Sequence, residues 1–168
     1  TVRTIVNSGR TMGLISGEKL TVESLHYGAL VHSGNDAAYA LAENYPGGVV
    51  NFVKAMNDKV KELNLGQTHF SNPVGLDDPG NFTTAKDLGK LAAVALNNKI
   101  LAKIVATRAI TVSDISFSYY HDLRNVNELV GSVAGVAGVK TGYTEYAGEI
   151  LVSEVKKHDR SVLFVIMK

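Results

Sequence analysis

The stretch His32-Ser33-Gly34-Asn35-Asp36 decides how the first half of the chain folds, because it interrupts two helical patterns. Apolar residues recur at helical spacing before it, up to about residue 31, and after it, up to about residue 45. Serine, glycine, asparagine and aspartate are the residues that end one helix and cap the next. The stretch therefore predicts a turn between two helices, and capping chemistry alone is enough to explain it.

Further helical patterns follow along the chain. Residues 49–65 carry one apolar stripe, and Gly66 stands where the residue that ends a helix is expected. Residues 67–82 are rich in proline and glycine and predict an ordered or functional loop. Thr84 begins the next helix with a pattern similar to a capping box, and a shorter helix is expected around residues 99–105.

After about residue 107 the composition becomes typical of strands, in the segments 108–114, 116–121, 148–155 and 161–167. The last two segments predict an antiparallel hairpin. Residues 161–167 are apolar on both faces, which predicts a central, covered strand. Helices first and strands last predict an α+β fold, with a mainly helical lobe over 1–106 packed beside a sheet portion over 107–168.

Composition excludes several classes of function. The chain has 168 residues and a formal net charge of +1 with the signs interspersed, which gives no electrostatic basis for binding nucleic acid. It contains no cysteine, which excludes disulfides, thiolate chemistry and cysteine-ligated zinc. Its histidines lack the spacing of metal ligands, so neither a metal nor another cofactor is expected. No apolar run approaches the ~20 residues of a membrane span.

A second short motif, Lys140-Thr141-Gly142, lies after a glycine-rich run and before the last hairpin. It places an ammonium group and a hydroxyl on a strand beside a glycine, which lets a ligand approach closely. Taken alone, it is more often a strand end with a solvated lysine, because short motifs commonly occur by chance. A Ser-x-Asn followed later by Lys-Thr-Gly, however, is the pair that accompanies Ser-x-x-Lys in penicillin-binding proteins and β-lactamases.

Three long stretches strengthen this resemblance. They are GEKLTVESLHYGALVHSGNDAAYALAE (17–43), THFSNPVGLDDPGNFTTAKDLGKLA (68–92) and GVKTGYTEYAGEILVSEVKKHDRSVLFVIMK (138–168). In this order they resemble the D-alanyl-D-alanine carboxypeptidases among the low-molecular-weight penicillin-binding proteins. The resemblance implies a β-lactamase/transpeptidase-like fold and an exported enzyme of the periplasm or another extracytoplasmic part of the cell envelope. It implies peptidoglycan stem peptides ending in D-Ala-D-Ala, and β-lactam antibiotics, as binding partners.

The resemblance also implies an acyl-transfer mechanism. A serine activated by the lysine of Ser-x-x-Lys attacks the D-Ala-D-Ala peptide bond, and water then hydrolyses the acyl-enzyme. Ser33 corresponds to the second serine, which relays a proton to the leaving amine. Asn35 corresponds to the hydrogen-bond partner that positions the lysine and the substrate, and Lys140 supplies positive charge for the terminal carboxylate.

The resemblance assigns substrate-binding roles to the three residues that follow Lys140. Thr141 offers a hydroxyl to the same terminal carboxylate. Gly142 keeps the strand open to the substrate. The backbone N–H of Tyr143 is expected to be one donor of the oxyanion hole.

The chain departs from the family in its first motif. The string Ser-x-x-Lys occurs at 16–19, within a glycine-containing loop, and at 153–156, on a predicted strand. The motif needs a helix, where residues i and i+3 share a face, whereas on a strand they point to opposite faces. Both strings are therefore accidental. We expect the nucleophile helix and the first sheet strands upstream of Thr1, so that the 168 residues form one incomplete catalytic domain.

An incomplete domain is expected to be inactive alone and to expose a sheet edge and groove, which a partner chain or a dimer could cover. Two alternatives stay open. A serine β-lactamase needs an added base for deacylation, but the chain contains no Glu-x-x-x-Asn and has Ser-Gly-Asn in place of Ser-Asp-Asn. A non-catalytic peptide-binding or assembly module needs no nucleophile at all.

Overall fold

The structure, a computed structural model, describes residues 1–4 and 6–168. Helices precede strands along the chain, which confirms the predicted α+β class. The helices are α1 (Val22–Leu30), α2 (Asn35–Glu43), α3 (Gly48–Glu62), α4 (Ala85–Leu96) and α5 (Lys99–Val105). The strands are β1 (Ala109–Ser113), β2 (Tyr120–Arg124), β3 (Val136–Thr144), β4 (Gly148–Lys157) and β5 (Arg160–Met167). None of the helices in this described part is long and apolar enough to cross a membrane.

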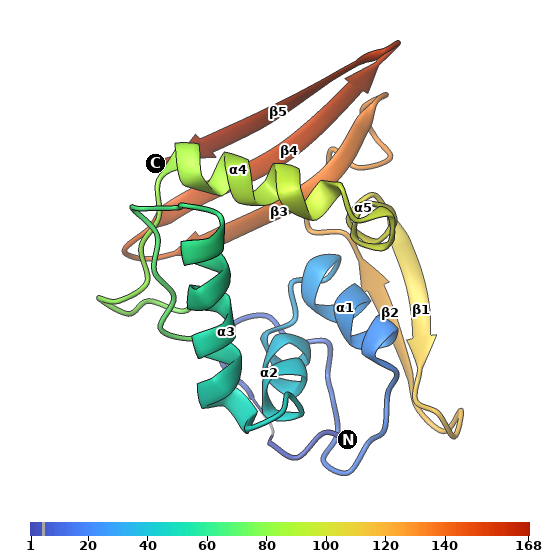
Figure 1. The fold of residues 1–168 in the computed structure, drawn as a ribbon. Coiled ribbons are helices and arrows are strands. Elements are labelled where there is room, and N and C mark those ends of the chain that lie inside the picture. Colours follow the sequence, from blue (N-terminus) through green and yellow to red (C-terminus); the bar gives the residue numbers. More distant parts are fainter. Residues whose placement is uncertain (5) are drawn as a thin grey trace.

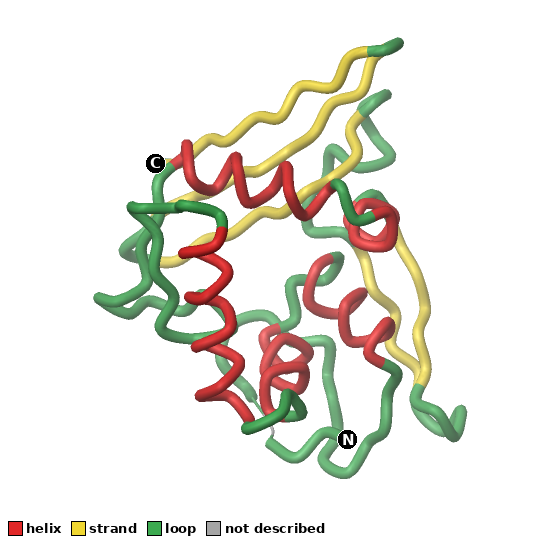
Figure 2. Tube along the Cα trace, in the orientation of Figure 1, coloured by secondary structure: helices red, strands yellow, loops and turns green. Residues whose placement is uncertain are grey.

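The strands form two antiparallel sheets, one above the helices and the other to their right in the view of Figures 1 and 2. The larger sheet has the order β3-β4-β5, and α4 lies across one of its faces with contacts to β5. The smaller sheet is the hairpin β1-β2, which packs beside α1. Helix α5 contacts both α1 and β3, so it connects the helical lobe to the strand that carries Lys140.

The core lies between the helices and the small sheet. It includes residues from the first 20 positions, from α1, α2 and α5, and from both strands of the hairpin: Val2, Met12, Leu14, Leu25, Tyr27, Val31, Ala37, Ala40, Ile104, Val112 and Leu123. Gly28 lets α1 approach α2 closely, because a Cβ there would lie 2.9 Å from the Cβ of Ala37. The turn between these two helices is thus held by packing on both sides.

Asp36 connects the first segment of the chain to the start of α2. Its carboxylate is buried, and it accepts hydrogen bonds from the backbone N–H groups of Met12 (2.9 Å), Gly13 (3.0 Å) and Leu14 (3.0 Å). Asp36 also lies in the first turn of α2, where the positive end of the helix dipole favours a negative charge. One carboxylate therefore fixes a loop that lies more than 20 residues earlier in the sequence.

A second buried contact holds the same segment from the side of the small sheet. The ring of His121, on β2, bonds through Nε2 to Oε1 of Glu18 at 2.7 Å and through Nδ1 to the carbonyl of Met12 at 3.0 Å. Both side chains are almost completely buried. The described residues between positions 12 and 18 are therefore an ordered part of the core, although none of them lies in a helix or strand.

The predicted capping chemistry is confirmed at Thr84 but not at the start of α2 or at the end of α3. Helix α2 begins directly after Gly34, and no side chain caps it. Thr84 caps α4 by accepting from the N–H of Asp87 at 3.2 Å, as predicted. The predicted end of α3 at Gly66 is wrong. Asn64 takes the left-handed conformation there (φ 53°), and the N–H of Leu65 closes the helix on the carbonyl of Val60 at 3.0 Å. Asparagine tolerates this conformation because its short polar side chain bonds locally.

The prediction that residues 161–167 form a central, covered strand is also wrong for the described chain. β5 lies at the edge of its sheet. Val165 faces Gly89 of α4, but Val162, Phe164 and Ile166 leave 50%, 47% and 60% of their surface exposed. The apolar pattern indicates cover on both faces, and within the described residues helix α4 covers only one.

We expect Asp36→Ala to lower the free energy of unfolding by about 3 kcal/mol, because it leaves buried N–H groups without an acceptor. Asp36→Asn retains one acceptor oxygen and should cost less. Asp58→Ala is the matched control: Asp58 is an exposed acid of α3 that pairs with Lys54, and such pairs contribute little. Urea unfolding of the complete protein measures all three, and equal midpoints for the Asp36 and Asp58 variants would contradict the assignment.

Candidate active site

The turn between α1 and α2 places Ser33 in an unusual backbone conformation. Ser33 has φ 60°, in the left-handed region that non-glycine residues seldom adopt. The N–H of Gly34 bonds to the carbonyl of Gly28 at 2.9 Å and fixes the turn. A side chain at Gly34 would not fit, because its Cβ would lie 2.9 Å from Oδ1 of Asp36 and 3.2 Å from the backbone N of Met12. The middle residue of Ser-Gly-Asn is therefore glycine for steric reasons.

Strand β3 brings Lys140 to this turn. Nζ of Lys140 donates a hydrogen bond to Oγ of Ser33 at 2.6 Å, although the two residues are 107 positions apart. The same ammonium group donates to the carbonyl of Thr141. Because β3 is an edge strand of its sheet, part of its backbone is free to bind a ligand. The structure thus places the two predicted motifs side by side.

Asn35, two positions after Ser33, is held by residues of the first segment of the chain. Its side-chain Nδ2 donates to the carbonyl of Ser8 at 2.9 Å, and its backbone N–H donates to the carbonyl of Arg10 at 2.8 Å. The role that the resemblance gives to Asn35, positioning the lysine of Ser-x-x-Lys and the substrate, stays a prediction. In this structure Asn35 positions residues 8–10 against the start of α2.

The remaining residues of the second motif line β3. The place that a Cβ of Gly142 would take is open, with no heavy atom within 4 Å. Thr141 is half-buried, and Tyr143 leaves 71% of its surface exposed. Their roles toward a carboxylate and an oxyanion stay predictions, while the open space above Gly142 leaves room for a ligand to approach this strand.

The site is positively charged and has no counterion of its own. Burial, and secondarily the positive charge of Arg10, lower the pKa of Lys140 to about 8. No carboxylate oxygen of the described residues lies within 4.0 Å of a side-chain nitrogen of Arg10 or Lys140. At neutral pH Lys140 is mostly protonated, so the site favours an anionic ligand.

Neither Ser-x-x-Lys string forms a nucleophile in the described structure. Residues 16 and 17 form a turn, outside any helix. Ser153 lies on β4, is buried, and donates through Oγ to the carbonyl of Gly138 at 2.7 Å. Lys156, on the same strand, pairs with Glu154 at 3.0 Å. Both strings therefore serve local structure.

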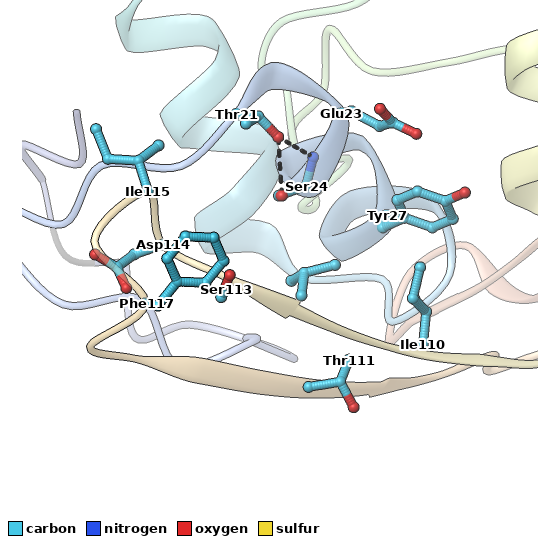
Figure 3. Close-up of a pocket in the computed structure, with 11 residues that line it drawn as sticks. Thr21, Glu23, Ser24, Tyr27, Ile110, Thr111, Ser113, Asp114, Ile115 and Phe117 are labelled. Carbon is cyan, nitrogen blue, oxygen red and sulfur yellow. Dashed lines mark hydrogen bonds between the residues drawn. The ribbon is translucent and has the colours of Figure 1, made fainter.

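A hollow of about 490 Å³ lies elsewhere, between the start of α1 and the β1-β2 hairpin (Figure 3). Its polar groups serve local structure. Thr21 caps α1 by accepting from the N–H of Ser24 at 3.0 Å. The hydroxyl of Ser116 and backbone N–H groups of the hairpin turn donate to Asp114 and lower its pKa to about 2. The hollow contains none of the motif residues, and the described residues form no cluster of three or more metal-ligating side chains.

Sequence reasoning missed three features that hold or charge the site. The sequence predicts only an ordinary helix cap at Asp36, whereas its carboxylate bonds to a separate segment of the chain. The buried pair of Glu18 and His121 joins residues 103 positions apart. Arg10 lies in a segment without periodicity. No local pattern marks such contacts, because each depends on a partner that only the fold brings near.

Comparison with known proteins decides the family. Residues 3–168 match the family described as D-alanyl-D-alanine carboxypeptidase. The chain belongs to this family. The predicted relationship is thereby confirmed, and the three stretches that suggested it all lie within the matched region.

Curated relatives agree with the family match. The chain is 36% identical over 158 residues to D-alanyl-D-alanine carboxypeptidase DacF of Bacillus subtilis, which covers 94% of this chain and 40% of that protein. It is 33% identical over 173 residues to a D-alanyl-D-alanine carboxypeptidase of Streptomyces sp., which covers 97% of this chain and 60% of that protein. The chain spans about half the length of the curated relatives that it matches.

Solved structures share the fold. A mutant of the Streptomyces DD-transpeptidase matches with a TM-score of 0.90 at 33% identity, covering 96% of this chain and 66% of that one. Penicillin binding protein 5 from Haemophilus influenzae matches with a TM-score of 0.86 at 33% identity, covering 96% of this chain and 46% of that one. The predicted β-lactamase/transpeptidase-like arrangement of a helical lobe beside antiparallel strands is confirmed.

Proposed function

We propose that residues 1–168 belong to a serine-type D-Ala-D-Ala carboxypeptidase that acts on peptidoglycan stem peptides through an acyl-enzyme. β-Lactam antibiotics bind the same site. One observation carries the proposal: the 2.6 Å hydrogen bond between Lys140 and Ser33, which joins Ser-Gly-Asn and Lys-Thr-Gly at one positively charged site. Because stem peptides lie outside the cytoplasm, the proposal places the enzyme in the periplasm or another extracytoplasmic part of the cell envelope.

Lys140 and Ser33 act as a proton relay in this proposal. Oγ of Ser33 accepts from the ammonium group of Lys140, so the hydroxyl proton of Ser33 takes no part in that bond. When the peptide bond breaks, Ser33 passes this proton to the leaving amine of the terminal D-alanine, and Lys140 replaces it. The pKa of Lys140, lowered to about 8, suits the transfer because efficient acids and bases titrate near the working pH.

The second motif binds the carboxyl end of the peptide. Lys140 offers its charge and Thr141 its hydroxyl to the terminal carboxylate, and charge-assisted hydrogen bonds of this kind are strong. The backbone N–H of Tyr143 stabilises the oxyanion that develops on the attacked carbonyl. The open space at Gly142 supports this arrangement, since a side chain there would extend to where a ligand approaches β3.

The nucleophile comes from outside residues 1–168 in this proposal. The Ser-x-x-Lys mechanism needs a serine whose hydroxyl lies next to a lysine on one helix face, and neither Ser-x-x-Lys string of the chain lies on a helix. The helical part (1–106) and the sheet part (107–168) together then form one incomplete catalytic domain. Its two motifs bind and orient the peptide for a serine supplied by another segment.

A fluorescent penicillin tests this proposal. We expect a covalent adduct on the complete protein and none on the isolated 168 residues, whose folding circular dichroism should establish first. An adduct on the isolated chain would show that it contains its own nucleophile. Absence of an adduct on the complete protein, with slow release of D-alanine from stem peptides, would favour a non-catalytic binding module. Rapid release of hydrolysed penicillin would favour a β-lactamase.

The charge of Lys140 predicts the pH dependence of acylation. The rate should fall as pH rises through about 8, because the ammonium group then loses its proton. Lys140→Ala should slow acylation roughly 10- to 100-fold at pH 7, from the loss of charged hydrogen bonds. Lys140→Arg keeps its charge throughout this range and should lose the alkaline decline. Stopped-flow penicillin acylation measures both effects, and an unchanged alkaline decline in Lys140→Arg would contradict the role of Lys140.

The exposed apolar face of β5 supports one further part of the proposal, that a partner chain or a second copy covers the sheet. Val162, Phe164 and Ile166 form this face beside the unpaired edge of the strand. Multi-angle light scattering of the 18.0 kDa chain should give a mass near that of a dimer. Phe164→Glu should shift it toward the monomer, because a charge cannot be buried cheaply. A monomer at every concentration would contradict the dimer.

A further inference from the structure

Residues 8–10 form a turn that lies directly against the Ser-Gly-Asn motif. Asn35 holds it at two points, with its side-chain amide on the carbonyl of Ser8 and its backbone N–H on the carbonyl of Arg10. Gly9, between them, has φ 69°, and a Cβ there would lie 2.5 Å from Nδ2 of Asn35. The sequence Ser-Gly-Arg therefore brings the backbone of residues 8–10 into direct contact with Asn35 of the motif.

The segment that follows Arg10 is rigidly anchored. The carboxylate of Asp36 accepts from the N–H groups of residues 12, 13 and 14. The ring of His121 bonds to the carbonyl of Met12. These contacts fix the point in the backbone, beside the site, from which the Arg10 side chain extends.

Arg10 is a free cation at this position. It is exposed, and no carboxylate oxygen of residues 1–4 and 6–168 lies within 4.0 Å of its side-chain nitrogens. Its charge reaches Lys140, whose pKa it helps to lower. Two such cations repel, and the described residues supply no carboxylate oxygen within 4.0 Å of either one to relieve this repulsion.

The proposed function uses only one of these two charges. Lys140 and Thr141 bind the terminal carboxylate of the peptide, which carries a single negative charge. Within one motif, Ser33 contacts Lys140 through its hydroxyl, and Asn35, two positions later, contacts residues 8–10. If the leaving end of the peptide is at Lys140, the acyl end extends toward Arg10.

Resting on that proposed function, we propose that Arg10 is a specificity-determining residue. It binds a side-chain carboxylate on the residue that precedes D-Ala-D-Ala in the substrate. A guanidinium group matches the planar geometry of a carboxylate with two parallel hydrogen bonds, which gives selectivity as well as affinity. The substrate class is thus a peptide with two carboxylates, one at its end and one on the acyl side of the bond that breaks.

Two peptides that differ in one group test the assignment. Both end in D-Ala-D-Ala, and the preceding residue is glutamate in one and glutamine in the other. The complete protein should cleave the glutamate peptide with a kcat/KM about tenfold higher, through a lower KM, as expected for one charged hydrogen-bonded pair. Arg10→Gln should abolish this preference, and Arg10→Lys should keep part of it.

Arg3→Gln is the matched control. It removes the same charge from the same segment, but the backbone of Arg3 is held by Glu43, at the opposite end of α2 from Asn35. The preference for the glutamate peptide should survive in this variant. Circular dichroism of Arg10→Gln, compared with that of the unaltered protein, establishes that the variant folds.

The outcomes separate the two proposals. A preference for glutamate that persists in Arg10→Gln, or an equal loss of kcat/KM for both peptides, would overturn the role of Arg10 and leave the carboxypeptidase intact. Absence of cleavage and of penicillin acylation in the unaltered protein would instead overturn the proposed function. In that case calorimetric binding of the two peptides still tests Arg10, since tighter binding of the glutamate peptide must depend on it.

Discussion

The site depends on the buried carboxylate of Asp36. It holds the N–H groups of three consecutive residues, 12–14, at the first turn of α2, and thereby fixes the segment before α1 against the Ser-Gly-Asn turn. A buried carboxylate is tolerated only where donors surround it, and here the backbone supplies them. The same residue also limits the space at Gly34, so the left-handed turn that presents Ser33 and the loop that carries Arg10 share one anchor.

Local chemistry made much of the fold predictable. Thr84 caps the helix that it was expected to cap, and a turn at residues 31–34 separates α1 from α2, close to the predicted 32–36. The proximity of Ser33 to Lys140 could also be predicted, but only through resemblance to a family. Periodicity locates a residue on a helix or strand, whereas a contact across 107 positions is a property of the whole fold.

The sequence-based predictions fail for two reasons. Either the contact that determines the structure comes from a residue far away in the sequence, or two residue types can adopt the same backbone conformation. Asn64 ends α3 in place of Gly66, since asparagine also accepts a left-handed conformation. The apolar pattern of β5 correctly indicates a strand, but it does not reveal which neighbour covers the second face. Asn35 bonds to residues 8–10, which no spacing rule connects to it.

The formal net charge of +1 conceals a strongly uneven distribution of charge around the site. Several carboxylates already accept hydrogen bonds within the fold. Asp36 accepts from backbone N–H groups, Glu18 bonds to the ring of His121, and Asp87 accepts from the N–H of Gln67 at 2.9 Å. Lys140 and Arg10 have no such partner within the described chain. Fold-determining carboxylates therefore lie in the interior while the cations of the site stay free. This separation produces a local positive potential that attracts an anionic peptide, although composition alone indicates a nearly neutral protein.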